Sequence, residues 1–264
     1  MTFMANQKIH KHKMRLDSLL VERGLAENRE RAQALILTGE VLVDDRPVDK
    51  VGTLIPASAV IRIRNEMNPY VSRGGLKLRG ALDAFGVSPA GLVAFDVGAS
   101  TGGFTDCLLQ AGAAKVYALD VGYGQLAWKL REDPRVVNIE RTNIRYYDGA
   151  GISDEIDLAV LDASFISLKL IIPAVIRLIK DGALLVALIK PQFEVEKGEV
   201  GSRGVVREPA LHQRVLAQIE AFCCGLGLKV LGTCESMLTG SAGNREFFIC
   251  LKKPPDSGTG RRGK

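Results

Sequence analysis

The chain has 264 residues, 47% of them hydrophobic and 25% charged, and it carries a net charge of +5. This composition is ordinary for a globular protein and excludes a disordered, collagen-like or disulfide-rich chain. The length suits one large domain, or a medium domain together with a small one.

Cysteine usage and apolar runs narrow the class further. The five cysteines form no C-x-x-C pair, so we expect reduced thiols and no metal site. No stretch reaches the roughly 18 consecutive apolar residues of a membrane span. Residues 1–13 lack the apolar core of a secretory signal. We therefore expect a cytoplasmic protein without a membrane partner.

The positive charge is concentrated in three segments. Residues 1–15, 62–79 and 252–264 each carry a net charge of +4, which leaves −7 on the rest of the chain. Basic tails are often merely solvated, but basic clusters on a near-neutral body favour a polyanion such as RNA as the partner.

The first predicted elements form a small α+β module over residues 14–65, after a basic tail over 1–13. One helix ends at Gly24, and a second begins after the capping residue Asn28 and ends at Gly39. Short strands are expected at 41–43 and 60–63, with a turn at 44–47. The apolar positions with helical spacing are Leu16, Leu19, Leu20, Ala32, Leu35 and Ile36.

This module resembles the αL RNA-binding domain, also called the S-four type. The resemblance rests on R-L-D-x-x-L-x-x-x-G followed by R-A-x-x-L-I-x-x-G-x-V-x-V. In that family basic residues on the two helices face RNA, and Arg15, Arg29 and Arg31 match those positions. For Arg29 and Arg31 the alternative is an ordinary solvated helix surface.

Residues 66–71 contain Asn68-Pro69 and are expected to be a linker. Over 72–252 the pattern then alternates between strand and helix. Apolar strands are expected at 93–97, 115–120, 136–139, 158–162, 183–189, 228–234 and 247–251, and helices at 104–111, 125–131, 168–180 and 208–226. This alternation predicts a doubly wound, Rossmann-like α/β domain, with a parallel sheet, an antiparallel finish and ligands at the carboxyl ends of the strands.

A glycine-rich loop follows the first of these strands and reads DVGASTGGF over 96–104. Asp96 ends that strand, and Asp120 ends the next, where a carboxylate can accept hydrogen bonds from ribose hydroxyls. A site for a dinucleotide has the spacing G-x-G-x-x-G, whereas this loop has G-x-x-x-G-G beside a carboxylate that would repel a pyrophosphate. S-adenosylmethionine has no phosphate, and it carries an amino group that a carboxylate would suit. We therefore expect S-adenosylmethionine as the cofactor. The expected cofactor-binding residues are Asp96, Gly98, Ala99, Ser100, Gly102, Gly103, Phe104, Asp120, Val121, Asn143 and Asp162.

Two charged residues end the fourth and fifth strands of the predicted sheet. Asp162 follows the fourth, and Lys190 follows a run of seven apolar residues in the fifth. Because the ends of adjacent parallel strands are neighbours, and because an unpaired buried lysine is costly, an Asp162–Lys190 pair is expected over the cofactor crevice. A lysine that simply emerges into solvent is the alternative.

The whole chain resembles the TlyA family of ribosomal RNA 2′-O-methyltransferases, whose catalytic domain is of the FtsJ type. The matching motifs include YVSRGGLKL at 70–78, LDVGYGQL at 119–126, LDASFISL at 161–168, IKPQFE at 189–194, GVVREPALH at 204–212 and GNREFF at 243–248. The segment at 236–242 departs from the family by lacking prolines, which leaves the conformation of that loop open.

This resemblance implies a Lys-Asp-Lys-Glu tetrad around the target ribose, formed here by Lys77, Asp162, Lys190 and Glu246. Lys190 would be the base or proton acceptor, Asp162 and Glu246 would orient it, and Lys77 would hold the ribose or its phosphate. The implied reaction is 2′-O-methylation of cytidine in 16S ribosomal RNA, 23S ribosomal RNA or both, free or in ribosomal subunits. The expected RNA-binding residues are Arg15, Arg29, Arg31, Arg62, Arg64, Arg73 and Lys77, and residues 253–264 are expected to be a basic tail.

Other functions remain as alternatives. An RNA base amino-methyltransferase would carry Pro-Pro and an aromatic residue after the acid, and Ala163-Ser164-Phe165 keeps only the aromatic. A carbon-5 pyrimidine methyltransferase needs a cysteine at a strand end, whereas Cys107 and Cys223 lie in predicted helices. A membrane-active haemolysin is a label sometimes given to this family, and no strongly amphipathic basic helix supports it.

Overall fold

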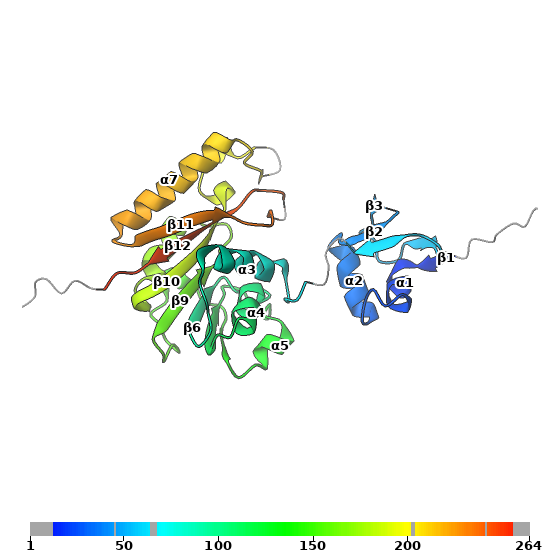
Figure 1. The fold of residues 1–264 in the computed structure, drawn as a ribbon, viewed down its shortest axis with the longest axis horizontal. Coiled ribbons are helices and arrows are strands. Elements are labelled where there is room, and N and C mark those ends of the chain that lie inside the picture. Colours follow the sequence, from blue (N-terminus) through cyan, green and yellow to red (C-terminus); the bar gives the residue numbers. More distant parts are fainter. Residues whose placement is uncertain (1–12, 45, 64–67, 202–203, 241, 256–264) are drawn as a thin grey trace, which may run out of the picture. The chain divides into compact units, whose positions relative to one another are not determined.

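The computed structural model describes residues 13–44, 46–63, 68–201, 204–240 and 242–255. The chain divides between Asn68 and Pro69 into two compact units (Figure 1). Each unit is described by itself.

The described residues of the first unit form two helices and five short strands. In chain order these are β1 (Lys13–Arg15), α1 (Leu16–Glu22), α2 (Arg29–Leu37), β2 (Val41–Val43), β3 (Arg46–Pro47), β4 (Leu54–Pro56) and β5 (Ile61–Ile63). β1 pairs with β4, and β2 lies between β3 and β5. Asn28 caps α2, because its side chain accepts a hydrogen bond of 2.8 Å from the Arg31 N–H. Both helices bury their apolar sides against the strands.

Two details of this unit differ from the sequence prediction. Residues 46 and 47, expected in a turn, form strand β3, because the chain already reverses at Asp44, whose φ is +49°. β1 and β4 were not expected, because β1 reads Lys-Met-Arg and fully buries none of its side chains, and β4 ends in a proline, which is unusual inside a sheet.

The second unit is built on a seven-stranded sheet with the strand order β11-β12-β10-β9-β6-β7-β8. Its strands are β6 (Val93–Val97), β7 (Lys115–Leu119), β8 (Val136–Ile139), β9 (Ile156–Leu161), β10 (Ile179–Ile189), β11 (Lys229–Glu235) and β12 (Phe247–Lys252). The first five are parallel, whereas β12 runs antiparallel to both β10 and β11. The expected mostly parallel α/β sheet with an antiparallel finish is confirmed.

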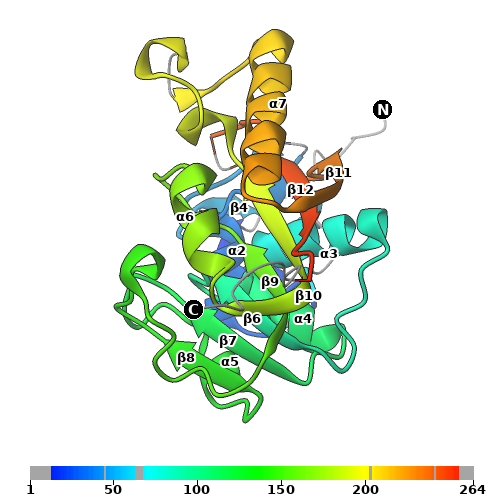
Figure 2. The ribbon, with the colours of Figure 1, turned by 90° about the vertical axis from the view of Figure 1, so that its left-hand side faces the viewer.

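Helices cover both faces of this sheet. They are α3 (Arg73–Phe85), α4 (Gly103–Gln110), α5 (Trp128–Arg131), α6 (Leu168–Val175) and α7 (Pro209–Gly225), with 3-10 turns η1 (Ile144–Tyr146), η2 (Pro191–Phe193) and η3 (Lys197–Glu199). Side chains of α3, α4 and α5 share one apolar core with one face of the strands, and those of α6 and α7 share a second core with the other face. Figure 2 shows central strands between α6 on one side and α3 and α4 on the other.

In the second unit, two helix boundaries differ from the prediction by several residues, and one helix was not predicted. The helix expected at 168–180 ends at Val175, and β10 already begins at Ile179, which pairs with Ile156 before a register shift. Its Pro173 removes one backbone donor and weakens the end of the helix. α5 begins at Trp128 rather than 125. α3 was not predicted, because three glycines among its residues disguise the apolar spacing of Leu78 and Leu82.

This topology brings distant residues to one edge of the sheet. The carboxyl ends of β6, β7, β9 and β10 lie next to one another in the parallel part. Because β12 runs the other way, its first residue, Phe247, pairs with the last residue of β10, Ile189. The start of β12 therefore meets the end of β10.

Candidate functional site

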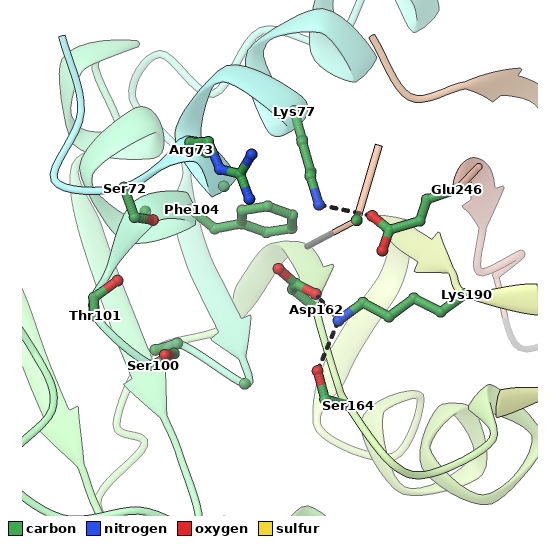
Figure 3. A pocket seen from close by; sticks show the side chains of 15 residues that line it. Ser72, Arg73, Lys77, Ser100, Thr101, Phe104, Asp162, Ser164, Lys190 and Glu246 are labelled. Carbon is green, nitrogen blue, oxygen red and sulfur yellow. Dashed lines mark hydrogen bonds and ion pairs between the residues drawn. The ribbon is translucent and has the colours of Figure 1, made fainter. Parts of the chain in front are cut away.

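Two cavities adjoin at this edge. The tetrad cavity, of about 390 Å³, is lined by Ser72, Arg73, Gly74, Lys77, Gly98, Ala99, Ser100, Thr101, Gly103, Phe104, Asp162, Ser164, Lys190, Gly240 and Glu246 (Figure 3). The Asp120 cavity, of about 470 Å³, is lined by Val97, Gly98, Ser100, Leu119, Asp120, Val121, Gln125, Asn143, Ile144, Asp162, Ala163, Ser164, Phe165, Ile166 and Ile171. Gly98, Ser100, Asp162 and Ser164 line both.

Lys77 and Glu246 form one ion pair of the tetrad cavity. Lys77 Nζ lies 2.7 Å from Glu246 Oε2, and their side chains are 11% and 3% exposed. Lys77 is held by the first turns of α3, and Glu246 immediately precedes β12. Gly240 lies against Glu246, because a Cβ at position 240 would collide with the Glu246 carboxylate. The absence of a side chain at Gly240 therefore lets this carboxylate face Lys77.

Lys190 and Asp162 form the second ion pair. Lys190 Nζ lies 2.6 Å from Asp162 Oδ1, and it donates a hydrogen bond of 2.8 Å to Ser164 Oγ. The angles of the Lys190–Asp162 contact do not make it a hydrogen bond, and Asp162 Oδ1 has no hydrogen-bond donor among the described residues. The pair expected at the ends of adjacent strands is thus present, with Ser164 as a third member.

All four residues of the expected tetrad therefore line one cavity, although they come from separate elements. In Figure 3 Lys77 and Glu246 face each other beside the Lys190–Asp162 pair. The cavity is lined by three cations and two anions, and its two lysines each form a short pair with one of the anions. Such paired charges can orient a polar acceptor and exchange a proton with it, while each charge keeps a partner when water is displaced.

The glycine-rich loop brings backbone close to both cavities. Gly98 has a φ of +87°, and a Cβ there would lie 2.6 Å from the Asp162 carbonyl oxygen. Ser100 has a φ of +49°. Asp120 holds this loop, since its Oδ2 accepts a hydrogen bond of 2.8 Å from the Ser100 N–H. Its Oδ1 accepts another of 2.7 Å from the Gly122 N–H. Asp120 thus shapes its cavity as well as lining it.

The expected cofactor residues fall into three groups. Those that line the Asp120 cavity are Gly98, Ser100, Asp120, Val121, Asn143 and Asp162. Ala99, Gly103 and Phe104 line the tetrad cavity instead. Asp96 and Gly102 line neither cavity, because Asp96 is fully buried and Gly102 packs against Leu126 and Leu130. Cofactor binding by Asp96 and Gly102 therefore stays a prediction, without a position in the lining of either cavity.

Asp96 has an unusual environment for a carboxyl group. Burial raises its pKa to about 7, although a hydrogen bond from Thr105 opposes that change. Thr105 Oγ1 donates this hydrogen bond to Asp96 Oδ2 over 2.6 Å. Asp96 Oδ1 has no hydrogen-bond partner within the described part of the chain. Asp96 thus sits directly beneath the loop that it precedes.

The expected RNA-binding residues differ in how they are held. Arg15 and Arg29 both reach the buried Asp17, at 3.0 and 2.9 Å, and each remains about half exposed. The hydrogen bond from Arg15 is the main reason that the pKa of Asp17 lies far below its ordinary value. Arg31 and Arg62 are exposed on α2 and β5. Arg73 lines the tetrad cavity with Lys77, and Arg64 lies outside the described residues.

Sequence reasoning missed Ser164 and Phe165 as site residues, although both stand in a motif that it noted. Phe165 lines the Asp120 cavity and is 90% exposed. Its φ is +64°, which is strained for a bulky residue, and its ring lies 5.2 Å from that of Phe193. The exposure and the backbone strain are properties of the folded chain, so the aromatic residue after the strand-end acid was the one available signal.

Within the described residues, no helix is long and apolar enough to cross a bilayer. The same residues contain no group of three or more His, Cys, Asp or Glu side chains arranged to hold a metal ion.

Comparison with known proteins gives two domain matches and close relatives. Residues 70–253 match the FtsJ-like methyltransferase family, and residues 14–61 match the S4 domain. The chain is 47% identical to YqxC of Bacillus subtilis, which is named as an rRNA methyltransferase, over 96% of this chain and 89% of that protein. It is 45% identical to the 16S/23S rRNA (cytidine-2′-O)-methyltransferase TlyA of Mycobacterium tuberculosis, over 94% and 93% of the two chains. A solved structure from Streptococcus thermophilus, named as a hemolysin, has a TM-score of 0.73 and 42% identity, and the match covers 94% and 93% of the two chains.

Proposed function

This chain belongs to the TlyA family of FtsJ-like methyltransferases, and on that premise we propose that it methylates the 2′ hydroxyl of cytidine in ribosomal RNA with S-adenosylmethionine. The observation that carries this proposal is the convergence of Lys77, Asp162, Lys190 and Glu246 in one cavity. That cavity shares residues with a second one suited to a nucleoside.

The Asp120 cavity fits S-adenosylmethionine in size and chemistry. Its volume of about 470 Å³ lies within the usual range for small-molecule sites. Apolar side chains such as Val121 and Ile144 can cover an adenine ring, and the Asp120 carboxylate can accept hydrogen bonds from ribose hydroxyls. The glycine at position 98 lets the loop lie against the backbone of Asp162, which lines the same cavity. When bound, S-adenosylmethionine supplies an activated methyl group.

The tetrad can perform the steps that the protein itself must supply, which are removal of a proton from the ribose hydroxyl and positioning of the ribose. A ribose hydroxyl is weakly acidic, so its proton has to leave as the new C–O bond forms. In its neutral form Lys190 can take that proton at Nζ, and Asp162 then faces the ammonium group at 2.6 Å. Lys77, held by Glu246, can bind the ribose or an adjacent phosphate together with Arg73.

The first unit would deliver the RNA. We propose an RNA-binding S4 domain over 14–65 and a methyltransferase domain over 72–252, joined by a linker over 66–71, with tails over 1–13 and 253–264. Arg15 and Arg29 are aligned by one carboxylate but remain exposed, so both can still reach phosphates. With ribosomal subunits as substrates, we propose a cytoplasmic location.

The test is methyl transfer to small and large ribosomal subunits from cells that lack the gene. Nuclease digestion and mass spectrometry should find 2′-O-methylcytidine in one or both RNAs. A methyl group on the cytosine ring instead would favour the base methyltransferase alternative. If no RNA is methylated but the protein releases dye from liposomes, the proposal is wrong and the haemolysin alternative gains support.

A further inference from the structure

The described arginines of the second unit fall into two classes. Five form ion pairs with a carboxylate, namely Arg79, Arg131, Arg135, Arg214 and Arg245. Arg73, Arg141, Arg145, Arg177 and Arg207 form none within the described residues. Arg73 belongs to the tetrad cavity. Three of the other four, Arg141, Arg145 and Arg177, are exposed. Arg141 and Arg145 flank two residues of the Asp120 cavity, at positions 143 and 144.

Two of these arginines lie over exposed tyrosine rings. The Arg141 guanidinium is 4.0 Å from the centre of the Tyr123 ring, and that tyrosine is 68% exposed. The Arg145 guanidinium is 5.3 Å from the Tyr146 ring, and Tyr146 is 76% exposed. Exposed aromatic rings beside unpaired arginines combine a stacking surface for bases with charge for phosphates.

Backbone hydrogen bonds join the segments that carry these residues. The Arg141 N–H donates to the Gly122 carbonyl over 2.9 Å, and the Thr142 N–H donates to the Asp120 carbonyl over 3.0 Å. The same segments contribute Asp120 and Asn143 to the Asp120 cavity. The segments that carry Tyr123 and Arg141 are therefore held in a fixed position relative to the proposed cofactor site.

A separate groove of about 370 Å³ brings the third arginine into the same surface. It is lined by Arg145, Tyr146, Tyr147, Asp148, Arg177 and Leu178. Asp148 is the one acidic member of this lining, and it accepts a hydrogen bond of 2.9 Å from the Ala150 N–H. The two arginines outweigh this single carboxylate, so the groove retains a positive charge.

We propose that Tyr123, Arg141, Arg145, Tyr146 and Arg177, here called the arginine–tyrosine surface, bind a single-stranded stretch of RNA near the acceptor nucleotide. Arg145 and Arg177 contact phosphates in the groove, and the Tyr123 and Tyr146 rings stack on unpaired bases. This inference rests on the proposed RNA substrate and adds a second RNA contact, in the methyltransferase domain itself. It gives a role to arginines that have no carboxylate partner in the described part of the chain.

The test compares the full-length protein with the double variant Arg145→Ala/Arg177→Ala. The control is Arg135→Ala/Arg214→Ala, which removes the same charge from arginines that are already paired. Filter binding of a ribosomal RNA fragment across a salt series should show a several-fold loss of affinity in the first variant. Its salt slope should fall by about 1.4 units, roughly 0.7 for each phosphate contact with a single strand. The control should bind like the original chain, and melting curves and cofactor affinity should be the same for all three.

Variants of Tyr146 distinguish the contribution of base stacking to RNA affinity from that of charge. We expect Tyr146→Ala to weaken RNA binding by about fivefold or more, whereas Tyr146→Phe should bind normally because it keeps the ring. Unchanged affinity and slope in the arginine variant would overturn the proposal. Normal binding to naked RNA with slower methylation of intact subunits would also overturn it, in favour of a ribosomal protein as the partner. Failure of the unaltered protein to methylate any RNA would overturn the proposed function instead.

Discussion

The two lysines of the tetrad cavity have different surroundings, which suggests different roles in the reaction. Lys77 makes one short contact, to a carboxylate that is 3% exposed. Lys190 contacts both Asp162 and the Ser164 hydroxyl. A lysine with a hydroxyl and a carboxylate beside it can gain or lose a proton without leaving either charge state unsolvated. This difference supports Lys190, rather than Lys77, as the proton acceptor.

Replacing Lys190 should therefore greatly slow methyl transfer without preventing cofactor binding. We expect Lys190→Ala to lower kcat by about a hundredfold to ten-thousandfold, because a positioned acid–base group contributes roughly that much. Calorimetry should find nearly unchanged affinity for S-adenosylmethionine, since Lys190 does not line the Asp120 cavity. Lys180→Ala is the control, because Lys180 lies at the other end of β10 and pairs with Asp157. Near-normal turnover by Lys190→Ala would remove the proposed base.

Asp96 gives a prediction on pH and stability. Burial raises its pKa to about 7, so the folded state holds the proton more tightly than the unfolded chain, in which the pKa is about 4. The contribution of this group to stability is full below about pH 4 and is lost as the pH rises to about 7. Asparagine does not ionise, so the melting temperature of Asp96→Asn relative to the original chain should increase between pH 5 and pH 8.

The expected increase is several degrees, because about 2 kcal/mol corresponds to roughly 4–8 °C in a domain of this size. Scanning calorimetry without cofactor measures it. Asp133→Asn is the control, since Arg135 lowers the pKa of Asp133 and the group is ionised in both states throughout this range. A relative melting temperature for Asp96→Asn that stays constant with pH would show that Asp96 is not held in this way.

At the scale of elements, the loop between β6 and α4 determines how the two cavities meet. Gly98 lies on this loop at the point where it crosses the Asp162 backbone. A methyl group there would push the loop away from the residue that forms an ion pair with Lys190. The glycine is therefore needed for the contact between elements as well as for its own conformation.

Gly98→Ala should weaken S-adenosylmethionine binding at least tenfold and reduce thermal stability. Gly151→Ala is a matched control, because Gly151 has a similar φ of +89° but nothing within 4 Å of its Cβ position. The control carries the same backbone strain without the collision, so its cofactor affinity should be normal. Equal affinities in the two variants would show that the close approach to Asp162 is unimportant.

Much of the fold and of the candidate site could be predicted, because parallel sheets place strand ends together. Asp162 and Lys190 were paired from that rule, and the structure has the pair. α3 could not be predicted from spacing, since its glycines are explained only by packing: a Cβ at Gly75 would overlap the Tyr70 ring. The burial of Asp96 was equally hidden, because a strand-end acid can point toward the ligand or beneath the loop.

At the scale of the whole molecule, the two units should be separable. A chain that starts at Pro69 keeps every strand of the large sheet and both cavities. We expect it to fold and to bind S-adenosylmethionine like the full chain, but to methylate ribosomal RNA at least tenfold more slowly, because it lacks the phosphate contacts of the first unit.

Tritiated-methyl transfer and filter binding across a salt series measure this change. Arg29→Ala/Arg31→Ala in the full chain should reproduce part of the loss and reduce the salt slope by about one to two units. Equal RNA affinity and turnover in the shortened and full chains would show that the first unit does not deliver the RNA.

The place of β12 late in the chain also determines when the tetrad cavity can be completed during synthesis. Every residue that lines the Asp120 cavity has been synthesised by Ile171, whereas Glu246 follows its partner Lys77 by 169 positions. β12 must then insert between β10 and β11, which do not pair with each other. A chain that has been translated only as far as β11 therefore lacks Glu246, and under the proposed function it is not yet able to methylate RNA.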